Sequence, residues 1–293
     1  MKRIVFYLYA ARGLATLKAV LAAGHELAFA VLPPGHDDVA DACRGLGVET
    51  RIIENVNDPD FVTQVSDARA TLGVIAGYST IFKPPLIDAP EFGTINLHGG
   101  RLPEYRGGSP LNWQIINGEA RAGISVIRVD AGIDTGPVLA EATFDIGPDE
   151  TIREAHERAN ALFPGLVVEV IGHMEAGTLN ERPQDEARAH YWRQRKPADG
   201  AIDWQNMTAR QVHDLVRAVT RPYPGARAAS PTGTLHIFET RMPAAALDGS
   251  PGQVIDGEGP GNDLCVACAE GAVLLTDYEV EGGGGLSTGM TLS

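Results

Sequence analysis

The sequence predicts an α/β protein with a Rossmann-like, mostly parallel sheet domain followed by a small OB-like β-barrel domain. In the first half, short apolar runs alternate with helical periodicity, as in βα units. In the last third, short strands alternate with Gly-rich turns, as in small barrels. A polar stretch separates these regions, so we expect a catalytic domain over residues 1–180, a linker over 181–200 and a second domain over 201–293.

Four apolar runs in the first eighty residues predict strands, with helices between them. Leu14, Leu17 and Val20 recur at helical spacing, and Gly24 is typical of a helix end. The predicted strands are 4–8, 26–32, 49–53 and 72–76, and the predicted helices are 13–23, 39–46 and 61–70.

The pattern is less regular between residues 80 and 180. Pro110 suits the first turn of a helix. A long helix begins near Thr151, and we expect Pro164 to kink or divide it because proline lacks a backbone donor. The predicted elements are strands 93–97, 124–129 and 138–144, helix 110–116, and loops 98–109 and 130–137.

The second domain is predicted from one helix and several short strands. Val212, Leu215 and Val219 share one face of an amphipathic helix. We expect the Gly-rich end from residue 282 onward to be frayed, because it offers little to pack. The remaining predictions are a turn over 222–225 and strands over 235–238, 252–255, 264–267 and 272–276.

The charge balance argues against a general nucleic-acid binder. The chain has 24 Lys and Arg against 38 Asp and Glu, a formal charge of −14, so its mean surface repels phosphate backbones. Arg193, Arg195 and Lys196 are the best candidates for a local basic patch, although a solvated inter-domain segment explains them at least as well.

Cysteine usage and hydropathy predict a cytoplasmic protein. Cys43, Cys265 and Cys268 are too few for a disulfide framework. We expect Cys265 and Cys268 to be core residues rather than zinc ligands, because an offset of three places them on opposite faces of a strand. The first apolar run is too short for a signal peptide, and no segment is long enough to predict a membrane span.

Three polar residues at predicted strand ends are the best candidates for chemistry. Asn96 and His98 are two residues apart on one strand, so their side chains project to the same side. Asp134 lies in a loop with two glycines, which permit tight turns and close approach by a ligand. Each residue also has a structural explanation: a hydrogen-bonded His, an Asn that satisfies loop backbone, and an Asx-turn Asp.

Phosphate-binding loops are missing from the expected places. The first strand-to-helix turn, residues 9–13, lacks the GxGxxG of a dinucleotide site, and no GxxxxGK[ST] occurs. We therefore expect neither an NAD enzyme nor an ATP-binding loop.

Residues 96–107 read Asn-Leu-His-Gly-Gly-Arg-Leu-Pro-Glu-Tyr-Arg-Gly and resemble the signature of N10-formyltetrahydrofolate-dependent formyltransferases. The resemblance runs from the first strand to about Gly283, and within it the nearest likeness is to nucleotide-sugar N-formyltransferases, such as the domain acting on UDP-4-amino-4-deoxy-L-arabinose. Gly100 and Arg101 depart from the usual Ser and Leu. The other matching segments are 110–113, 117–119, 130–136, 199–204, 216–219 and 221–226.

The resemblance implies a mechanism without a metal, in which an unprotonated amine attacks the formyl carbon of N10-formyltetrahydrofolate, the co-substrate, and the adduct then collapses and expels N10. Asn96 and protonated His98 would donate to the formyl oxygen, and Asp134 would hold His98 charged and accept the amine proton. The implied folate contacts are Tyr78, Thr80, Ile81, Phe82, Asp130, Ala131, Gly132 and Ile133, of which Tyr78, Ile81 and Phe82 could equally be core. The implied substrate contacts are Tyr9, Arg12, Arg101, Tyr105 and Arg106.

The resulting prediction is formyl transfer to the amine of a nucleotide-linked amino sugar, with methionyl-tRNA formyltransferase as the alternative. The acidic balance favours the sugar, because a tRNA needs cationic contacts. A third hypothesis, a protein that only binds folate, is suggested by Gly100 and Arg101 alone. A homodimer is possible, and no membrane partner is expected.

Overall fold

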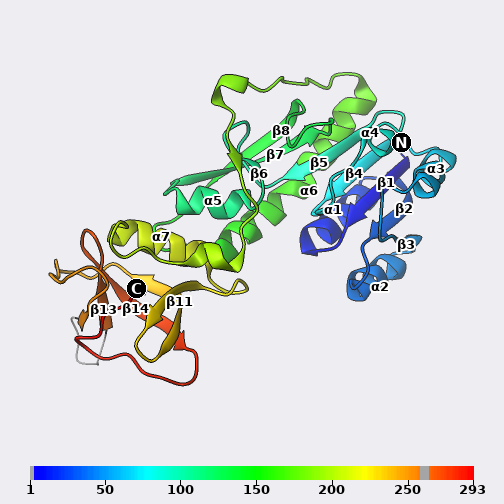
Figure 1. Cartoon of the computed structure of the whole chain (residues 1–293). Coiled ribbons are helices and arrows are strands. Elements are labelled where there is room, and N and C mark those ends of the chain that lie inside the picture. Colours follow the sequence, from blue (N-terminus) through cyan, green and yellow to red (C-terminus); the bar gives the residue numbers. More distant parts are fainter. Residues whose placement is uncertain (1–2, 258–263) are drawn as a thin grey trace. The chain divides into compact units, whose positions relative to one another are not determined.

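The computed structural model describes residues 3–257 and 264–293, and its contacts divide the chain into two compact units (Figure 1). The second unit consists of Gly108–Ala122, Asp145–His156 and Arg193–Ser293, and the first unit contains the rest. These boundaries differ from the predicted ones, because two segments of the first half pack with the C-terminal residues.

The first unit is built on a seven-stranded sheet with the order β3-β2-β1-β4-β5-β7-β8. β1 pairs in parallel with β2 and β4, and β5 pairs in parallel with β4 but antiparallel with β7. This confirms the predicted Rossmann-like, mostly parallel sheet. The strands are β1 Arg3–Leu8, β2 Glu26–Leu32, β3 Thr50–Ile52, β4 Leu72–Ala76, β5 Thr94–His98, β7 Arg121–Arg128 and β8 Val138–Asp145.

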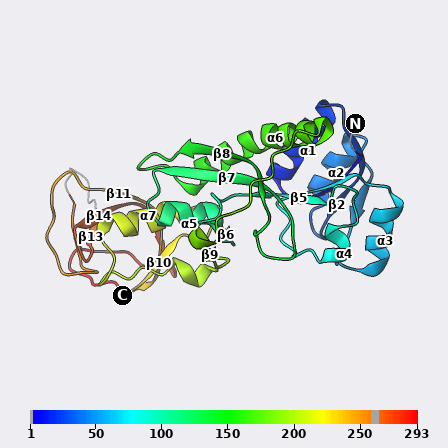
Figure 2. The ribbon, with the colours of Figure 1, turned by 90° about the horizontal axis from the view of Figure 1, so that it is seen from above.

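Helices cover both faces of this sheet: α1 and α6 lie on one side, and α3 and α4 on the other (Figure 2). β1 is buried between these layers, and its alternate side chains Val5 and Tyr7 pack in one core cluster with Phe61 and Leu86. The helices are α1 Ala11–Ala22, α2 Asp37–Gly45, α3 Pro59–Asp67, α4 Pro84–Ile87 and α6 Ile152–Ala176.

α6 is one helix with Pro164 inside it, so of the two predicted effects of this proline, a kink or a division, the division does not occur. An internal proline costs about 3 kcal/mol. Phe163 and Val167, on either side of Pro164, are fully buried. Burying two such side chains contributes a comparable amount, at about 1.5–3 kcal/mol each, which offsets the lost backbone hydrogen bond.

Much of the predicted linker is anchored to the first unit. Arg182 exchanges two backbone hydrogen bonds with Val138, and β9 Tyr191–Trp192 pairs in parallel with β6 Arg106–Gly107. Two short 3-10 helices also lie in this segment, Glu186–Arg188 in the first unit and Pro197–Gly200 in the second. The segment is therefore anchored through its backbone, while most of its polar side chains are exposed.

The second unit contains an antiparallel sheet with the order β10-β11-β14-β13-β12, which confirms a second, all-β sheet after the parallel one. α7 Ala209–Val219 contacts both α5 Pro110–Ile116 and β11. Its first turn is closed by a capping box between Thr208 and Gln211. The strands are β10 Ala226–Ser230, β11 Gly233–Arg241, β12 Val254–Asp256, β13 Leu264–Ala267 and β14 Ala272–Val280.

The C-terminal residues pack onto this unit, so the prediction of a frayed end is wrong. Leu292 is buried, and Ser293 exchanges two backbone hydrogen bonds with Ala229 of β10. These bonds satisfy edge groups of β10 that would otherwise be unpaired.

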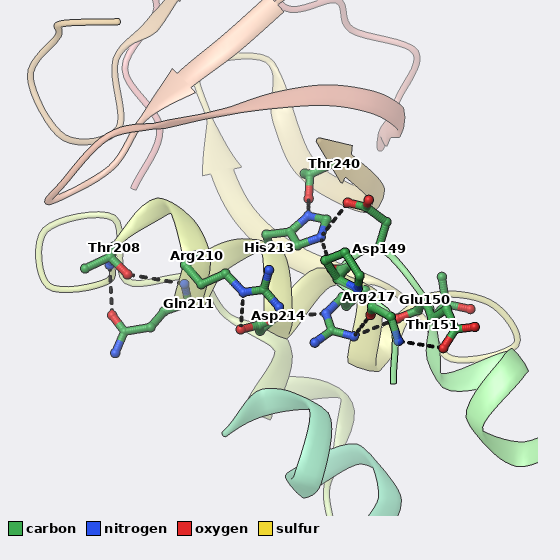
Figure 3. Close-up of polar contacts among 12 residues, drawn as sticks. Asp149, Glu150, Thr151, Thr208, Arg210, Gln211, His213, Asp214, Arg217 and Thr240 are labelled. Carbon is green, nitrogen blue, oxygen red and sulfur yellow. Dashed lines mark hydrogen bonds and ion pairs between the residues drawn. The ribbon is translucent and has the colours of Figure 1, made fainter. Parts of the chain in front are cut away.

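A buried polar network joins α7 to the loop that precedes α6 (Figure 3). Arg217 donates from Nε to Oδ1 of Asp214 at 2.7 Å and from Nη1 to the carbonyl of Glu150 at 2.7 Å. His213 Nε2 donates to the carbonyl of Pro148 at 3.1 Å, and its Nδ1 lies 2.9 Å from the hydroxyl of Thr240. The network thus holds the loop by its backbone carbonyls.

Candidate active site

Asn96 and His98 project from the same side of β5, as their spacing predicts. His98 is buried, and its Nε2 lies 2.6 Å from the carbonyl oxygen of Tyr105. A carbonyl can only accept, so Nε2 carries a proton and the ring presents Nδ1 to its other neighbours. Asn96 is half-buried, and its side-chain amide makes no hydrogen bond within residues 3–257 and 264–293. That amide is available to a ligand.

Asp134 reaches His98 because the loop after β7 turns back along β5. β7 ends beside the start of β5, where Ile95 pairs with Arg128, so the loop must return by about 10 Å. Oδ2 of Asp134 lies 3.5 Å from Nδ1 of His98, which is longer than a hydrogen bond but close enough for electrostatic interaction. The structure therefore brings Asp134 to His98, and places Asn96 two residues before His98.

The backbone of Asp134 has a φ of +54°, in the left-handed region, where Asp is better tolerated than most residues. The backbone N–H of Gly107 donates to Oδ2 of Asp134 at 2.9 Å. Gly107 itself has a φ of +93°, and a Cβ there would lie 2.2 Å from the carbonyl oxygen of Trp192. Only glycine allows this close approach.

The two glycines of the loop after β7 allow close approach by other atoms of the protein rather than by a ligand. A Cβ at Gly136 would lie 1.9 Å from the carbonyl oxygen of Arg128, and one at Gly132 would lie 2.1 Å from Oγ1 of Thr135. Asp130 accepts hydrogen bonds from the Gly132 N–H and the Thr135 hydroxyl, at 3.0 and 2.6 Å. The tight turn is thus fixed by contacts within the loop.

The residues predicted to contact folate divide into buried and exposed groups. Phe82 is buried and Tyr78 half-buried, with their rings 6.0 Å apart beside Tyr7 in the core, and burial raises the pKa of Tyr78 to about 12. Ile81 and Ile133 are 67% and 50% exposed, unusually open for large apolar side chains. The remaining predicted contacts, also exposed, are Thr80, Asp130, Ala131 and Gly132.

Three of the residues predicted to contact the substrate make side-chain contacts within the first unit. Arg12 donates from Nε to Oδ1 of Asn160 at 3.0 Å, and Tyr105 is buried with its ring stacked on Trp192. Arg106 is fully buried and paired with Glu186, an environment that does not support direct substrate contact.

The other two predicted substrate contacts lie nearer the surface. Tyr9 is half-buried, with its ring 4.9 Å from that of His36. Arg101 is half-buried, with its guanidinium carbon 5.6 Å from the centre of the Tyr105 ring.

The three cysteines lie in the interior of the protein. Cys43, Cys265 and Cys268 are all buried and unbridged, and burial raises the pKa of Cys268 to about 12, which keeps its thiol neutral. Among residues 3–257 and 264–293, no three His, Cys, Asp or Glu side chains are grouped to hold a metal ion. No helix in these ranges combines the length and apolarity needed to cross a bilayer.

Sequence comparison identifies the family. Residues 43–171 match the formyl transferase family and residues 195–288 match the formyl transferase C-terminal domain. The methionyl-tRNA formyltransferase of Solibacter usitatus is 36% identical over 290 residues, covering 96% of this chain and 91% of that protein. The chain belongs to the formyltransferase family.

Solved formyltransferases share the fold. The sugar 3N-formyl transferase WlaRD, crystallised in the presence of dTDP and 5-N-formyl-THF, matches with a TM-score of 0.71 at 14% identity, covering 95% of this chain and 98% of that chain. The methionyl-tRNA formyltransferase from Clostridium thermocellum matches with a TM-score of 0.61 at 19% identity, covering 83% and 93%. At these identities, both likenesses concern the fold alone.

The relatives overturn the predicted acceptor. The curated relatives that match at 32–36% identity are named methionyl-tRNA formyltransferase, which contradicts a nucleotide-linked amino sugar as substrate and partner. The same finding contradicts the expectation that nucleic acid is not a partner. Net charge is an average over the surface, whereas binding to a phosphate backbone requires only local cations.

Proposed function

We propose that this formyltransferase transfers the formyl group of N10-formyltetrahydrofolate to the α-amino group of methionyl-tRNA. The observation that carries the proposal is the match to a methionyl-tRNA formyltransferase at 36% identity over 91% of that protein. The cluster of Asn96, His98 and Asp134 supports the chemistry, because it combines an amide donor, an imidazole and a carboxylate within one unit.

Asn96 is proposed to stabilise the charge that develops on the formyl oxygen. Its amide makes no hydrogen bond in the described parts of the chain, so donation to a ligand breaks no existing contact. A donor held in place for such an oxygen contributes about 3 kcal/mol to the transition state, which is roughly a hundredfold in rate.

His98 and Asp134 are proposed to handle the proton. Nε2 of His98 is occupied by the carbonyl of Tyr105, which supports Nδ1 as the nitrogen that acts on the reacting atoms. When Nδ1 is protonated it can donate to the formyl oxygen, and the carboxylate 3.5 Å away stabilises the resulting cation. Asp134 can also accept the amine proton, directly or through a water.

The folate is proposed to lie along residues 78–82 and the loop 130–134. Ile81 and Ile133 support this placement, since two largely exposed apolar side chains in these segments are available to cover an aromatic ring. The proposed placement of the folate uses no metal ion.

The buried, unbridged cysteines support a reducing compartment such as the cytoplasm.

The test is formylation of methionyl-tRNA by the full chain with N10-formyltetrahydrofolate, with a panel of nucleotide-linked amino sugars as comparison. Asn96→Asp keeps the side-chain shape but removes both N–H donors, and should lower kcat about a hundredfold with little change in KM. Asn55→Asp is the matched control, because the side chain of exposed Asn55 accepts at Oδ1 from the N–H of Asn57 at 3.1 Å, a contact that Asp can keep. Absence of formyl-methionyl-tRNA would overturn the proposal.

A further inference from the structure

We propose that Gln184 and Arg106 are positioning residues that hold Asp134 in register with His98. The inference deepens the proposed function and rests on it, because the geometry of this pair matters to catalysis only if the pair acts on substrate. Neither side chain is proposed to touch the substrate: Gln184 contacts the main chain of Asp134, and Arg106 contacts Gln184.

Gln184 ties down the main chain on both sides of Thr135. Its Nε2 donates to the carbonyl of Asp134 at 2.8 Å and to the carbonyl of Gly136 at 2.7 Å, so both N–H groups of the amide are used. These two bonds fix the turn in which Asp134 adopts its left-handed backbone conformation. Without them, the conformation at Asp134 has less support against relaxation to a more favourable region.

Arg106 fixes the orientation of the Gln184 amide. Its Nε donates to Oε1 of Gln184 at 3.0 Å, which leaves Nε2 directed at the two carbonyls. Its Nη1 and Nη2 form a bidentate pair with the carboxylate of Glu186, at 2.9 and 2.6 Å, and Nη1 also donates to the hydroxyl of Tyr191 at 2.9 Å. The hydrogen bond that Arg106 donates to the Glu186 carboxylate raises the pKa of Arg106, so the guanidinium remains charged.

The backbone on either side of Arg106 contacts both His98 and Asp134. The carbonyl of Tyr105 accepts from Nε2 of His98, and the N–H of Gly107 donates to the carboxylate of Asp134. Gly107, the residue after Arg106, therefore holds the carboxylate of Asp134. Gln184, which is bound by the Arg106 side chain, holds the backbone carbonyl of Asp134. Through these contacts, the position of Arg106 is coupled to the orientation of Asp134 relative to His98.

The burial of Arg106 and its pairing with Glu186 indicate that Arg106 orients its partners rather than stabilising the fold. Arg106 is fully buried whereas the Glu186 side chain is 69% exposed. A buried charge contributes little net stability compared with an apolar side chain of the same size, but a planar guanidinium imposes direction on each of its partners. A site that requires a carboxylate at a fixed distance from an imidazole benefits from that direction.

The decisive variant is Gln184→Glu, which is nearly isosteric but replaces the donating nitrogen by an oxygen that faces two carbonyls. We expect the ring ¹⁵N chemical shifts of His98 to change, and kcat for methionyl-tRNA formylation to fall about 10- to 100-fold at unchanged KM. The His98 signals are assigned by their loss in His98→Gln. Glu186→Gln, at an exposed side chain, should change the same signals to a smaller extent, and it decides the question alone if Gln184→Glu does not fold.

Asn112→Ala provides the matched control. Asn112 is also a buried amide that donates to a backbone carbonyl, that of Ala218 at 2.7 Å, but it belongs to the second unit. Asn112→Ala should lower the unfolding temperature without altering the His98 signals.

The proposal would be overturned by a folded Gln184→Glu or Glu186→Gln variant whose His98 signals and pH profile of kcat coincide with those of the parent. If the ring signals change as expected but the parent protein does not formylate methionyl-tRNA, the proposed function fails and the positioning role stands.

Discussion

Replacing Arg217 by Met tests how strongly the buried network of α7 stabilises the second unit. The side chains of Arg217 and Asp214 are both 4% exposed, and the substitution removes the guanidinium while keeping much of its apolar stem. It leaves the Glu150 carbonyl without its Arg217 donor and deprives Asp214 Oδ1 of its 2.7 Å partner. Removing one member of a buried pair costs about 3–5 kcal/mol.

We expect the lower end of this range, about 3 kcal/mol, because Arg210 still donates to Oδ2 of Asp214 at 2.9 Å. For a unit of this size, that loss corresponds to a fall of about 10 °C in the unfolding temperature. Differential scanning calorimetry of the full chain at neutral pH measures it.

Arg210→Met is the matched control, because Arg210 pairs with the same carboxylate from a side chain that is 46% exposed. Exposed pairs contribute at most about 1 kcal/mol, so this variant should unfold within a few degrees of the parent. Equal, small shifts for Arg210→Met and Arg217→Met would refute the reasoning that burial makes the Arg217 contacts strong.

Three further predictions concern pH, the loop after β7 and the basic segment. Burial lowers the pKa of His213 from its usual 6.5 in the folded protein. As the pH falls below 6.5, the unfolded chain binds the proton before the folded protein does, so the free energy of unfolding decreases until the pH reaches the lower pKa of the folded state. The urea midpoint should therefore drop between about pH 7.5 and 5.5, and by less in His213→Gln. Gly136→Ala should lower kcat about a hundredfold by displacing the loop, whereas Gly165→Ala, where a Cβ meets nothing within 4 Å, should leave kcat unchanged; an active Gly136→Ala enzyme would contradict the geometry. Lys196→Ala should raise KM for methionyl-tRNA and reduce the salt dependence of binding by about one unit of slope, and an unchanged slope would exclude contact between Lys196 and the tRNA backbone.

The parallel sheet could be predicted because its strands are buried on both faces and appear as continuous apolar runs. β10 could not, since Ala226–Ser230 is made of small and polar residues that become a strand only by pairing with β11. The two-residue strands β6 and β9 carry no periodic signal at all, and they exist because residues far apart in the sequence meet. Long-range pairing is thus the part of the fold that local pattern does not contain.

The candidate site was predictable where spacing dictates geometry and not where backbone atoms do the positioning. Asn96 and His98 follow from alternation along one strand. The contributions of Tyr105 and Gly107 are a carbonyl and an N–H, which every residue but proline offers, so side-chain chemistry gives no hint of them. Gln184 lies in a charged stretch of the sequence, but its role depends on two carbonyls that lie 50 and 48 residues earlier in the chain.

The interleaved course of the chain constrains how the protein can be taken apart. A protease nick after Trp192 would separate the polypeptide into two pieces, yet the larger piece would still carry Gly108–Ala122 and Asp145–His156, whose partners lie in the smaller one. The pieces should therefore co-elute under native conditions and part only in denaturant. For the same reason, transplanting the C-terminal sheet onto another enzyme would require grafting two earlier inserts along with it, so recombination at a single crossover is a poor route to new members of this architecture.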